Sequence, residues 1–205
     1  MSAVMDKDRI LDLFRETGAM LEGHFILSSG KHSDRYFQCA LLLEHPKKAE
    51  QLAIEMARRV RSLHAEPYDI VIVPAMGAVT WAYEVARAMG TRAQFTERRT
   101  GSSRGDEMEL RRGFQVKPTD RILVVEDVMT TGGSAREVVE LLARLSVRPQ
   151  AAGCIVNRSG GNPFERDGLP LFALVDVNAI AWDPADCPLC KTGSKAVKPG
   201  SRPGS

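Results

Sequence analysis

Hydrophobic positions along the chain follow two alternating patterns. Apolar residues at helical spacing predict helices at residues 10–22, 46–60, 79–89 and 134–145, with Pro46 at a helix start that tolerates proline. Short aliphatic runs predict strands at residues 69–74, 92–97, 121–126, 151–157 and 171–177. Because near-continuous aliphatic strands alternate with helices, the pattern predicts an α/β fold. Its central sheet is mostly parallel and is flanked by helices on both faces.

Two segments interrupt this alternation. Residues 24–43, "HFILSSGKHSDRYFQCALLL", contain two short apolar runs around a Ser/Gly/Lys/Asp turn, which predicts a hairpin-like N-terminal unit. The stretch between Thr96 and Val116 has no apolar period and is rich in Arg, Gly and Ser. It is predicted to be a long exposed loop leading into a hairpin, and loops of this length in a compact domain often act as active-site lids.

The composition is that of an ordinary globular protein. The chain has 205 residues, of which 43% are hydrophobic and 26% charged, so one large domain is expected, predicted over residues 1–190. Residues 1–45 and the C-terminal segment are predicted to form a small hood over this domain, and residues 191–205, "KTGSKAVKPGSRPGS", a flexible tail.

Charge and hydropathy exclude some classes of partner. The net charge of +2 gives no basic excess of the kind that nucleic-acid binders carry. No apolar run reaches the roughly 18 residues of a membrane span, and the charged start "MSAVMDKDRILDLF" lacks the apolar core of a signal peptide. A cytoplasmic protein without nucleic-acid or membrane partners is therefore expected.

Four cysteines are too few and too scattered for a disulfide framework: Cys39, Cys154, Cys187 and Cys190. Cys187 and Cys190 form a C-x-x-C pair, but no second such pair and no paired histidines stand near them in the sequence. A structural or incidental role is therefore favoured over metal or redox chemistry.

The strongest candidate for chemistry lies where the strand at 121–126 ends. Glu126 and Asp127 are followed at once by "VMTTGGS" and a predicted helix. In an open parallel sheet ligands bind beyond the carboxyl ends of the strands, and the free N–H groups of a helix start favour an anion. Glycines allow close backbone approach, and the hydroxyls add donors or cap the helix. The carboxylates make sense if the ligand carries a phosphate at one end and ribose hydroxyls at the other.

Other phosphate motifs are absent. The loop lacks the G-x-x-x-x-G-K-[ST] pattern of nucleoside triphosphatases and the G-x-G-x-x-G pattern of dinucleotide sites. A strand-end acid pair followed by a capped helix remains the simpler structural alternative. It does not by itself explain two acids, two threonines, two glycines and a serine in nine residues.

The stretch "VVEDVMTTGGS", residues 124–134, resembles the phosphoribosyl-pyrophosphate signature of type I phosphoribosyltransferases. Residues 25–39, "FILSSGKHSDRYFQC", and residues 155–161, "IVNRSGG", resemble motifs of the orotate branch of that family. The resemblance runs from about residue 8 to residue 185 with matching element order. It implies transfer of phosphoribose from 5-phospho-α-D-ribose 1-diphosphate (PRPP) to orotate, giving orotidine 5′-phosphate and diphosphate in pyrimidine biosynthesis.

The resemblance also implies roles for single residues. Glu126 and Asp127 would act in catalysis by holding the ribose hydroxyls, and Arg158 would bind the orotate carboxylate or ring oxygens. A planar guanidinium suits that anion, although a surface ion pair is the alternative. The rest of the signature would bind PRPP, and Thr130 would also reach orotate: Val128, Met129, Thr130, Thr131, Gly132, Gly133 and Ser134.

Further PRPP and orotate contacts are implied outside the signature. Tyr36 and Phe37 would flank the pyrimidine ring, with a place in the core as the alternative for such aromatics. "PAMGAV", residues 74–79, resembles a diphosphate-binding turn in which Ala75, Met76 and Gly77 would offer backbone N–H groups.

The lid would supply cations for the leaving diphosphate. The candidates are Arg98, Arg99 and Arg104, the first two with a catalytic role, and for Arg99 and Arg104 a solvated charge run is the alternative. The resemblance implies a Mg²⁺ cofactor held mainly by PRPP and water rather than by protein ligands. It also implies a homodimer in which each lid reaches the neighbouring site.

The lid departs from the family's usual pattern. Many members carry lysines and a histidine there, whereas "TERRTGSSRGDEMELRRG" has neither, and Ser28 stands where a lysine is common. The identity of the catalytic lid residue is therefore open. Two alternatives remain, a phosphoribosyltransferase for another base and a PRPP-sensing regulator that binds nucleic acid, which would need a basic face that this chain lacks.

Overall fold

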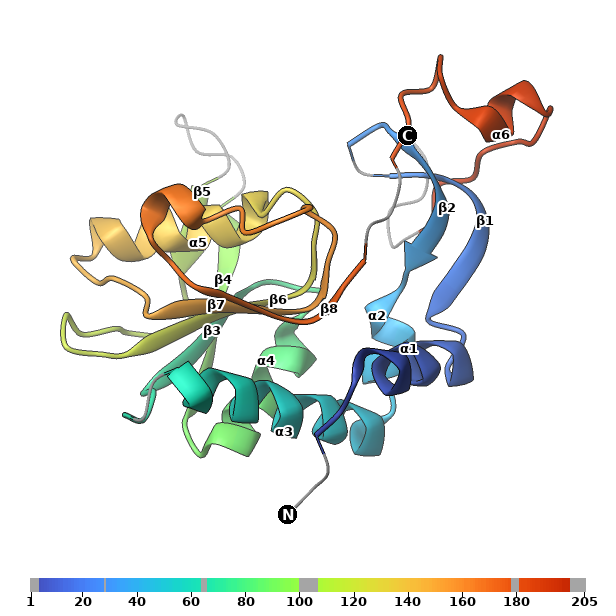
Figure 1. Cartoon of the computed structure of the whole chain (residues 1–205). Coiled ribbons are helices and arrows are strands. Elements are labelled where there is room, and N and C mark those ends of the chain that lie inside the picture. Colours follow the sequence, from blue (N-terminus) through green and yellow to red (C-terminus); the bar gives the residue numbers. More distant parts are fainter. Residues whose placement is uncertain (1–3, 28, 64–65, 100–106, 178–180, 200–205) are drawn as a thin grey trace.

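A six-stranded sheet forms the centre of the molecule, with the strands in the order β5-β4-β3-β6-β7-β8 (Figure 1). The computed structural model describes residues 4–27, 29–63, 66–99, 107–177 and 181–199. Neighbouring strands pair in parallel except β4 and β5, which are antiparallel. This confirms the predicted, mostly parallel α/β sheet. The strands are β3 Ile70–Pro74, β4 Arg92–Arg99, β5 Glu107–Leu110, β6 Ile122–Met129, β7 Ala151–Asn157 and β8 Leu171–Asp176.

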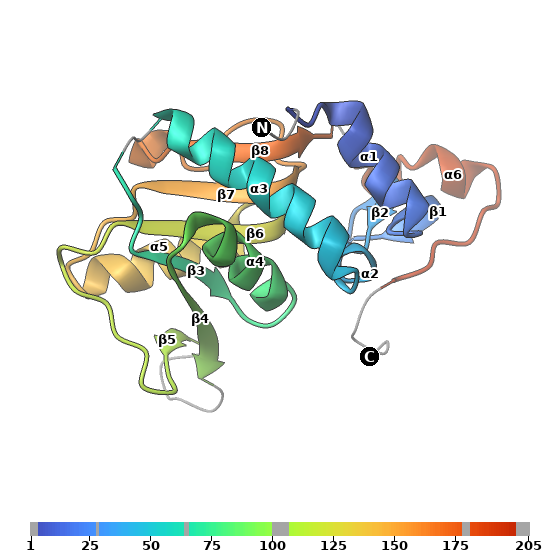
Figure 2. The ribbon, with the colours of Figure 1, turned by 90° about the horizontal axis from the view of Figure 1, so that it is seen from below.

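Helices cover both faces of this sheet (Figure 2). Helices α3 (Pro46–Leu63) and α4 (Val79–Met89) pack on one face, and α5 (Gly133–Arg144) packs on the other. Successive side chains of a strand point to opposite faces. Val71 of β3 therefore joins the core under α3 and α4, whereas Ile70 and Ile72 join the core under α5. A short 3₁₀ turn, η1 (Glu165–Asp167), lies between β7 and β8.

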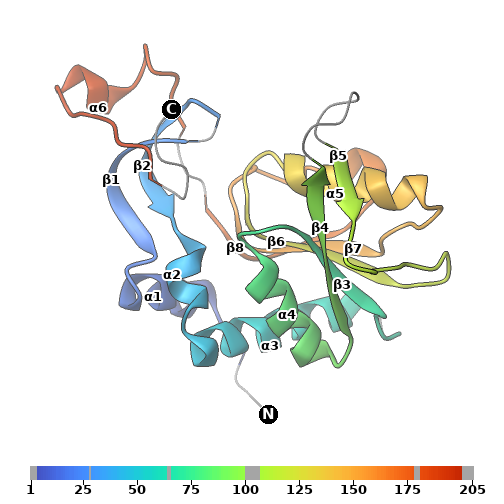
Figure 3. The same ribbon diagram turned by 180° about the vertical axis from the view of Figure 1, so that it is seen from behind.

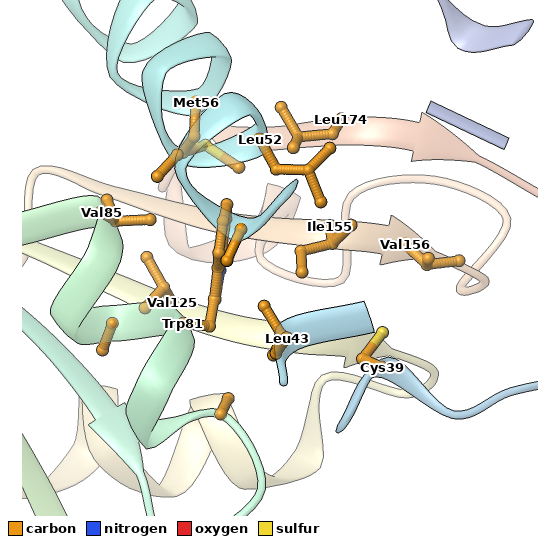
Figure 4. Close-up of a cluster of buried hydrophobic side chains, with 14 of the residues drawn as sticks. Cys39, Leu43, Leu52, Met56, Trp81, Val85, Val125, Ile155, Val156 and Leu174 are labelled. Atoms are coloured by element: carbon orange, nitrogen blue, oxygen red, sulfur yellow. The ribbon is translucent and has the colours of Figure 1, made fainter. Parts of the chain in front are cut away.

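The larger core is built around Trp81 of α4, which is fully buried (Figure 4). Its ring lies among Leu52 and Met56 of α3 and Val125 of β6. Burying a large aromatic side chain in this way contributes roughly 2–3 kcal/mol. The packing fixes both helices against the central strand whose carboxyl end carries the candidate site.

The N-terminal unit stands beside the sheet, and its strands form the predicted hairpin, which is antiparallel (Figures 1 and 3). Its elements are α1 Lys7–Glu16, β1 Met20–Ile26, β2 His32–Phe37 and α2 Cys39–Leu43. The C-terminal segment, with the short α6 (Pro188–Lys191), adds to this hairpin. Trp182 forms a bridge to His32, and Val197 forms one to Phe25.

The stretch predicted as a flexible tail, residues 191–205, makes backbone hydrogen bonds to the hairpin. The Val197 N–H donates to the His24 carbonyl, and the Ile26 N–H donates to the Val197 carbonyl. A flexible tail would lack such bonds. The last part of that expectation, residues 200–205, lies outside the described residues.

Two of the predicted boundaries that were wrong have a clear structural cause. Helix α1 ends at Glu16 rather than near Glu22, because Gly18 adopts a left-handed φ of 66°. The N–H groups of Gly18 and Ala19 then donate to the carbonyls of Arg15 and Phe14, which closes the helix in a Schellman motif. The following apolar residues, Met20 and Leu21, belong to β1 instead.

The second boundary is that of β6, which runs on to Met129 instead of ending at the acid pair. Val128 and Met129 still pair with β7, so both acids are strand residues and the loop begins only at Thr130.

Among the helices of the described ranges, none has the length and apolar character needed to cross a membrane.

Candidate active site

A pocket of about 660 Å³ opens at the carboxyl end of β6. The chain adds β4 on one side of β3 and then returns to place β6 on the other side. Neighbouring strands whose connections diverge in this way leave a crevice beyond their carboxyl ends, the usual ligand site of an open α/β sheet. The volume suits a small phosphorylated ligand.

The loop from Thr130 to Ser134 forms the floor of the pocket. Gly132 precedes helix α5 with a left-handed φ of 75° and, as a glycine, has no side chain that could cap the helix start. An added Cβ at Gly132 would lie 2.9 Å from Pro163 Cγ, so a glycine is required there on two grounds. Thr131 Oγ1 accepts a 3.4 Å hydrogen bond from the Gly133 N–H. The first turn of the helix offers its other N–H groups to an anion.

Three carboxylates face the same pocket: Glu126, Asp127 and Glu137. Burial, and then the negative charges of Asp127 and Glu137, raise the pKa of Glu126 to about 8. Burial also raises the pKa of Asp127, although its carboxylate accepts a 2.8 Å hydrogen bond from the Val128 N–H. Buried carboxyl groups whose pKa values are raised in this way favour a ligand that brings hydroxyl donors or a cation.

Arg158 follows β7 and also lines the pocket. Its backbone N–H donates to the Met129 carbonyl at 2.7 Å, and one guanidinium nitrogen donates to Ser33 Oγ at 3.3 Å. The buried Nε has no hydrogen-bond partner among the described residues. Burial lowers the pKa of Arg158, while Asp34 and Tyr36 oppose that shift. A buried donor of this kind calls for an acceptor supplied by a ligand.

The two aromatic candidates of β2 differ. Tyr36 is half-buried and lines the pocket, and the pKa of its hydroxyl is raised by burial and by Asp127. Phe37 also lines the pocket, but it is only 5% exposed and packs edge-on against Phe14 at 5.3 Å. Phe37 therefore lies mainly in the core, the alternative that the sequence had left open.

The predicted diphosphate turn lies outside the lining of this pocket. Its first amide is engaged, because the Ala75 N–H donates to the Thr96 carbonyl at 2.8 Å. Ala75 is thus not an open donor, contrary to the prediction. Met76 is 83% exposed, and an added Cβ at Gly77 would lie 3.9 Å from Asp127 Oδ2. The turn therefore borders the carboxylates.

The lid arginines lie at different distances from the pocket. Arg98 of β4 donates to Glu137 Oε1 at 2.9 Å, and Glu137 itself lines the pocket, so Arg98 stands at its rim. Arg99 pairs with Glu109 across the β4–β5 hairpin at 3.1 Å. The third candidate, Arg104, lies outside the described residues.

Sequence reasoning missed several residues of the pocket. Gln38 and Leu27 belong to the hairpin, Glu137 lies one helical turn into α5, and Lys198 and Pro199 come from the C-terminal segment. The only signal that the sequence offered was the positive charge of Lys198, which suits an anionic ligand. It was overlooked because the Pro/Gly-rich composition around it is typical of a flexible tail.

Comparisons with known proteins agree with this geometry. Residues 42–185 match the model of the phosphoribosyl transferase domain. The chain is 48% identical over 198 residues to an orotate phosphoribosyltransferase of Heliobacterium modesticaldum, covering 97% of this chain and 100% of that protein.

Two solved structures share the fold. The orotate phosphoribosyltransferase of Aeropyrum pernix superposes with a TM-score of 0.65 at 27% identity, covering 82% of this chain and 93% of that one. The adenine phosphoribosyltransferase of Trypanosoma brucei superposes with a TM-score of 0.63 at 14% identity, covering 84% and 82%, a likeness of fold alone. The chain therefore belongs to the phosphoribosyltransferase family, in the branch of its orotate phosphoribosyltransferase relatives.

Proposed function

We propose that this protein transfers phosphoribose from PRPP to orotate, giving orotidine 5′-phosphate and diphosphate. The observation that carries the proposal is the meeting of three groups in one pocket. These are a helix start for a phosphate, a carboxylate pair for a ribose, and a buried arginine donor. The identity to orotate phosphoribosyltransferases over nearly the whole chain supports the choice of base.

The binding mode follows from the pocket walls. Residues 130–134 would hold the 5′-phosphate, with Glu126 and Asp127 accepting hydrogen bonds from the ribose hydroxyls. The orotate ring would then lie toward Tyr36, with its carboxylate on Arg158. An arginine fork matches a planar carboxylate, and the unpartnered Nε supplies one of its donors.

The reaction replaces one bond at ribose C1 with another. The C1–O bond to diphosphate breaks, the C1–N bond to orotate N1 forms, and the N1 proton is released. Positive charge develops on the ribose ring during this exchange, and Glu126 and Asp127, which line the pocket, would stabilise it. Arg98 and Arg99, which the lid hairpin carries, would receive the diphosphate charge. No residue needs to act as a covalent nucleophile.

Mg²⁺ is the cofactor that we propose, held mainly by PRPP and water. When bound, it neutralises diphosphate charge and helps orient the leaving group. The residues fit a cation in their vicinity, because three carboxylates gather in the pocket and the pKa of Glu126 is raised.

We also propose a cytoplasmic homodimer whose lids cross into the neighbouring site. Met76 and Tyr83 are 83% and 62% exposed, and such large apolar side chains suit an interface beside the lid hairpin. All four cysteines are free thiols, which suits a reducing compartment.

The test of the reaction follows orotate absorbance after addition of PRPP and Mg²⁺. We expect a loss of orotate absorbance that requires the protein, PRPP and Mg²⁺ together. The loss should be much slower with Asp127→Asn. Turnover of hypoxanthine or uracil in place of orotate would contradict the choice of base. Inactivity with every base, together with retained PRPP binding, would favour a sensor.

Lid exchange has a separate test. Arg99→Ala has an intact phosphate loop, and Asp127→Asn has an intact lid. If lids act across a two-fold dimer, mixing the two variants restores up to about a quarter of wild-type activity, since mixed dimers contain one complete site. No recovery after subunit exchange would show that each lid serves its own subunit.

A further inference from the structure

Four potential metal ligands converge where the hairpin meets the C-terminal segment. His24 lies on β1 and His32 on β2. Cys187 is the N-cap residue of α6, and Cys190 lies within that helix. One ligand atom from each lies within 4.8 Å of all the others. Among the described residues, this is the group of histidines, cysteines and carboxylates whose geometry suits a metal ion.

Three of the following separations match the edges of one coordination tetrahedron, and the separation between His24 and His32 is shorter. His24 Nε2 is 2.9 Å from His32 Nδ1 and 3.4 Å from Cys187 Sγ. Cys190 Sγ is 3.3 Å from His32 Nδ1 and 3.7 Å from His24 Nε2. Zinc binds thiolate at about 2.3 Å and imidazole at about 2.0–2.1 Å, which places tetrahedral ligands about 3.3–3.8 Å apart.

Hydrogen bonding alone does not account for this arrangement. His24 Nδ1 lies 3.0 Å from the Ser194 carbonyl, which only accepts, so the proton of a neutral ring sits on Nδ1. The lone pair of His24 Nε2 then faces the ligand atoms of His32, Cys187 and Cys190 together. This single lone pair accepts one well-aligned hydrogen bond, so it satisfies at most one of these three contacts. A histidine whose second nitrogen donates to a carbonyl is also the usual oriented metal ligand.

We propose that His24, His32, Cys187 and Cys190 bind one Zn²⁺ ion that fastens the C-terminal segment to the hairpin. Two imidazoles and two thiolates in tetrahedral array select zinc among the common divalent metals. Four protein ligands leave no open position, so the site is structural. His24, His32 and Cys187 are at most 8% exposed, and the exposed Cys190 provides a route of entry.

The sequence had argued against this role. A C-x-x-C pair needs two more ligands, and none stands close to Cys187 and Cys190 in the chain. The hairpin supplies them from a point more than 150 residues earlier, through the Trp182–His32 and Val197–Phe25 bridges. The pair alone was weak evidence, and the fold adds the histidines.

The ion would act on the pocket through the chain that follows α6. From Cys190 the backbone runs to Val197, which pairs with β1, and Lys198 then lines the pocket. Fixing α6 to the hairpin therefore fixes the approach of Lys198. This consequence does not depend on which base the enzyme uses.

The experiment measures metal in the full-length protein, purified under reducing conditions without an affinity tag that binds metal. We expect inductively coupled plasma mass spectrometry to find about one zinc ion per chain in the wild-type protein. After removal of zinc, Co²⁺ should give the visible bands and thiolate charge-transfer absorption of a tetrahedral site with two sulfurs.

Variants assign the ligands. Two variants each remove one ligand: Cys190→Ser, at an exposed position, and His32→Gln. Losing an outer-shell partner typically weakens metal binding about 10–100-fold, and we expect each of these variants to weaken zinc binding more than that. Cys154→Ala removes a thiol from the core under α5, and His45→Gln removes an exposed histidine. Both controls are expected to retain the metal.

Three outcomes would overturn the proposal. Wild type without zinc that also fails to bind added Zn²⁺ or Co²⁺ would exclude the site, and this result needs no variant to fold. Zinc retained in both ligand variants would place the ion elsewhere. A Cys187–Cys190 disulfide that persists in the reduced preparation would assign the pair to redox chemistry instead.

Discussion

Glu126 shows at the scale of a single residue how a binding site opposes stability. Its carboxyl is held among buried groups and beside two other acids, so its pKa is raised to about 8. In the folded protein the proton stays on up to that pH, whereas an unfolded glutamate releases it near 4.5. Between these values unfolding releases a proton, and the free energy of unfolding falls as the pH rises.

Glu126→Gln is therefore expected to stabilise the ligand-free protein above pH 8 and to change little at about pH 5. The melting temperature should rise by roughly 2–4 °C for each kcal/mol regained, while turnover falls. Melting curves across this pH range test the prediction, with Glu140→Gln as the control at an exposed position of α5. Parallel pH profiles for wild type and Glu126→Gln would contradict it.

Gly132 combines a left-handed backbone with a close neighbour, and the two effects can be separated. Gly90 has a similar φ of 72° but nothing within 4 Å of an added Cβ. Gly90→Ala should cost about 1–2 kcal/mol of unfolding free energy from backbone strain alone. Gly132→Ala should cost more, because its methyl would meet Pro163, and it should also raise KM for PRPP. Denaturant titrations and kinetics check both; equal costs would refute the role of Pro163.

At the scale of elements, the sequence predicted the strands of the sheet well because aliphatic runs and intervening helices carry a local signal. The runs at 69–74, 151–157 and 171–177 became β3, β7 and β8 with boundaries within one residue. The end of β6 was missed because its acids resemble loop residues, yet backbone pairing with β7 keeps them extended. Sequence periodicity does not report such pairing.

The lid hairpin gives a prediction about two arginines with different surroundings. Arg98 contacts Glu137 of the pocket, whereas Arg112 pairs with Glu97 outside it. Arg98→Ala should lower kcat/KM for PRPP on the order of 10–100-fold, the loss of one charge-assisted contact. Arg112→Ala should change it by about threefold or less, as for a surface ion pair. Similar losses in both variants, measured by initial rates, would argue for a general charge effect.

At the scale of the whole molecule, the pocket joins the two ends of the chain. Tyr36 comes from the N-terminal hairpin and Lys198 from the last described residues, and both line the same cavity. The sequence indicated the phosphate loop and Arg158 through local motifs. The contact between the hairpin and the C-terminal segment has no local pattern, so neither periodicity nor composition could predict it.

Truncation tests this joining. A chain ending at Ser194 loses the Val197 pairing and Lys198, whereas a chain ending at Pro199 keeps both. The shorter form should bind PRPP or orotate roughly 10-fold more weakly through loss of a charge-assisted contact. Its far-ultraviolet circular dichroism should stay that of an α/β protein. Equal kinetics in the two truncated forms would show that Lys198 does not serve the site.

The position of Lys198 also has a consequence for the making of the protein. A ribosome delivers the hairpin first, then the phosphate loop, and Lys198 last of the three. The sheet and loop can therefore form while the pocket wall is still missing. Each new molecule gains its finished cavity only after Lys198 has left the ribosome, and a message that stops before this codon encodes a protein with a folded sheet and an incomplete site.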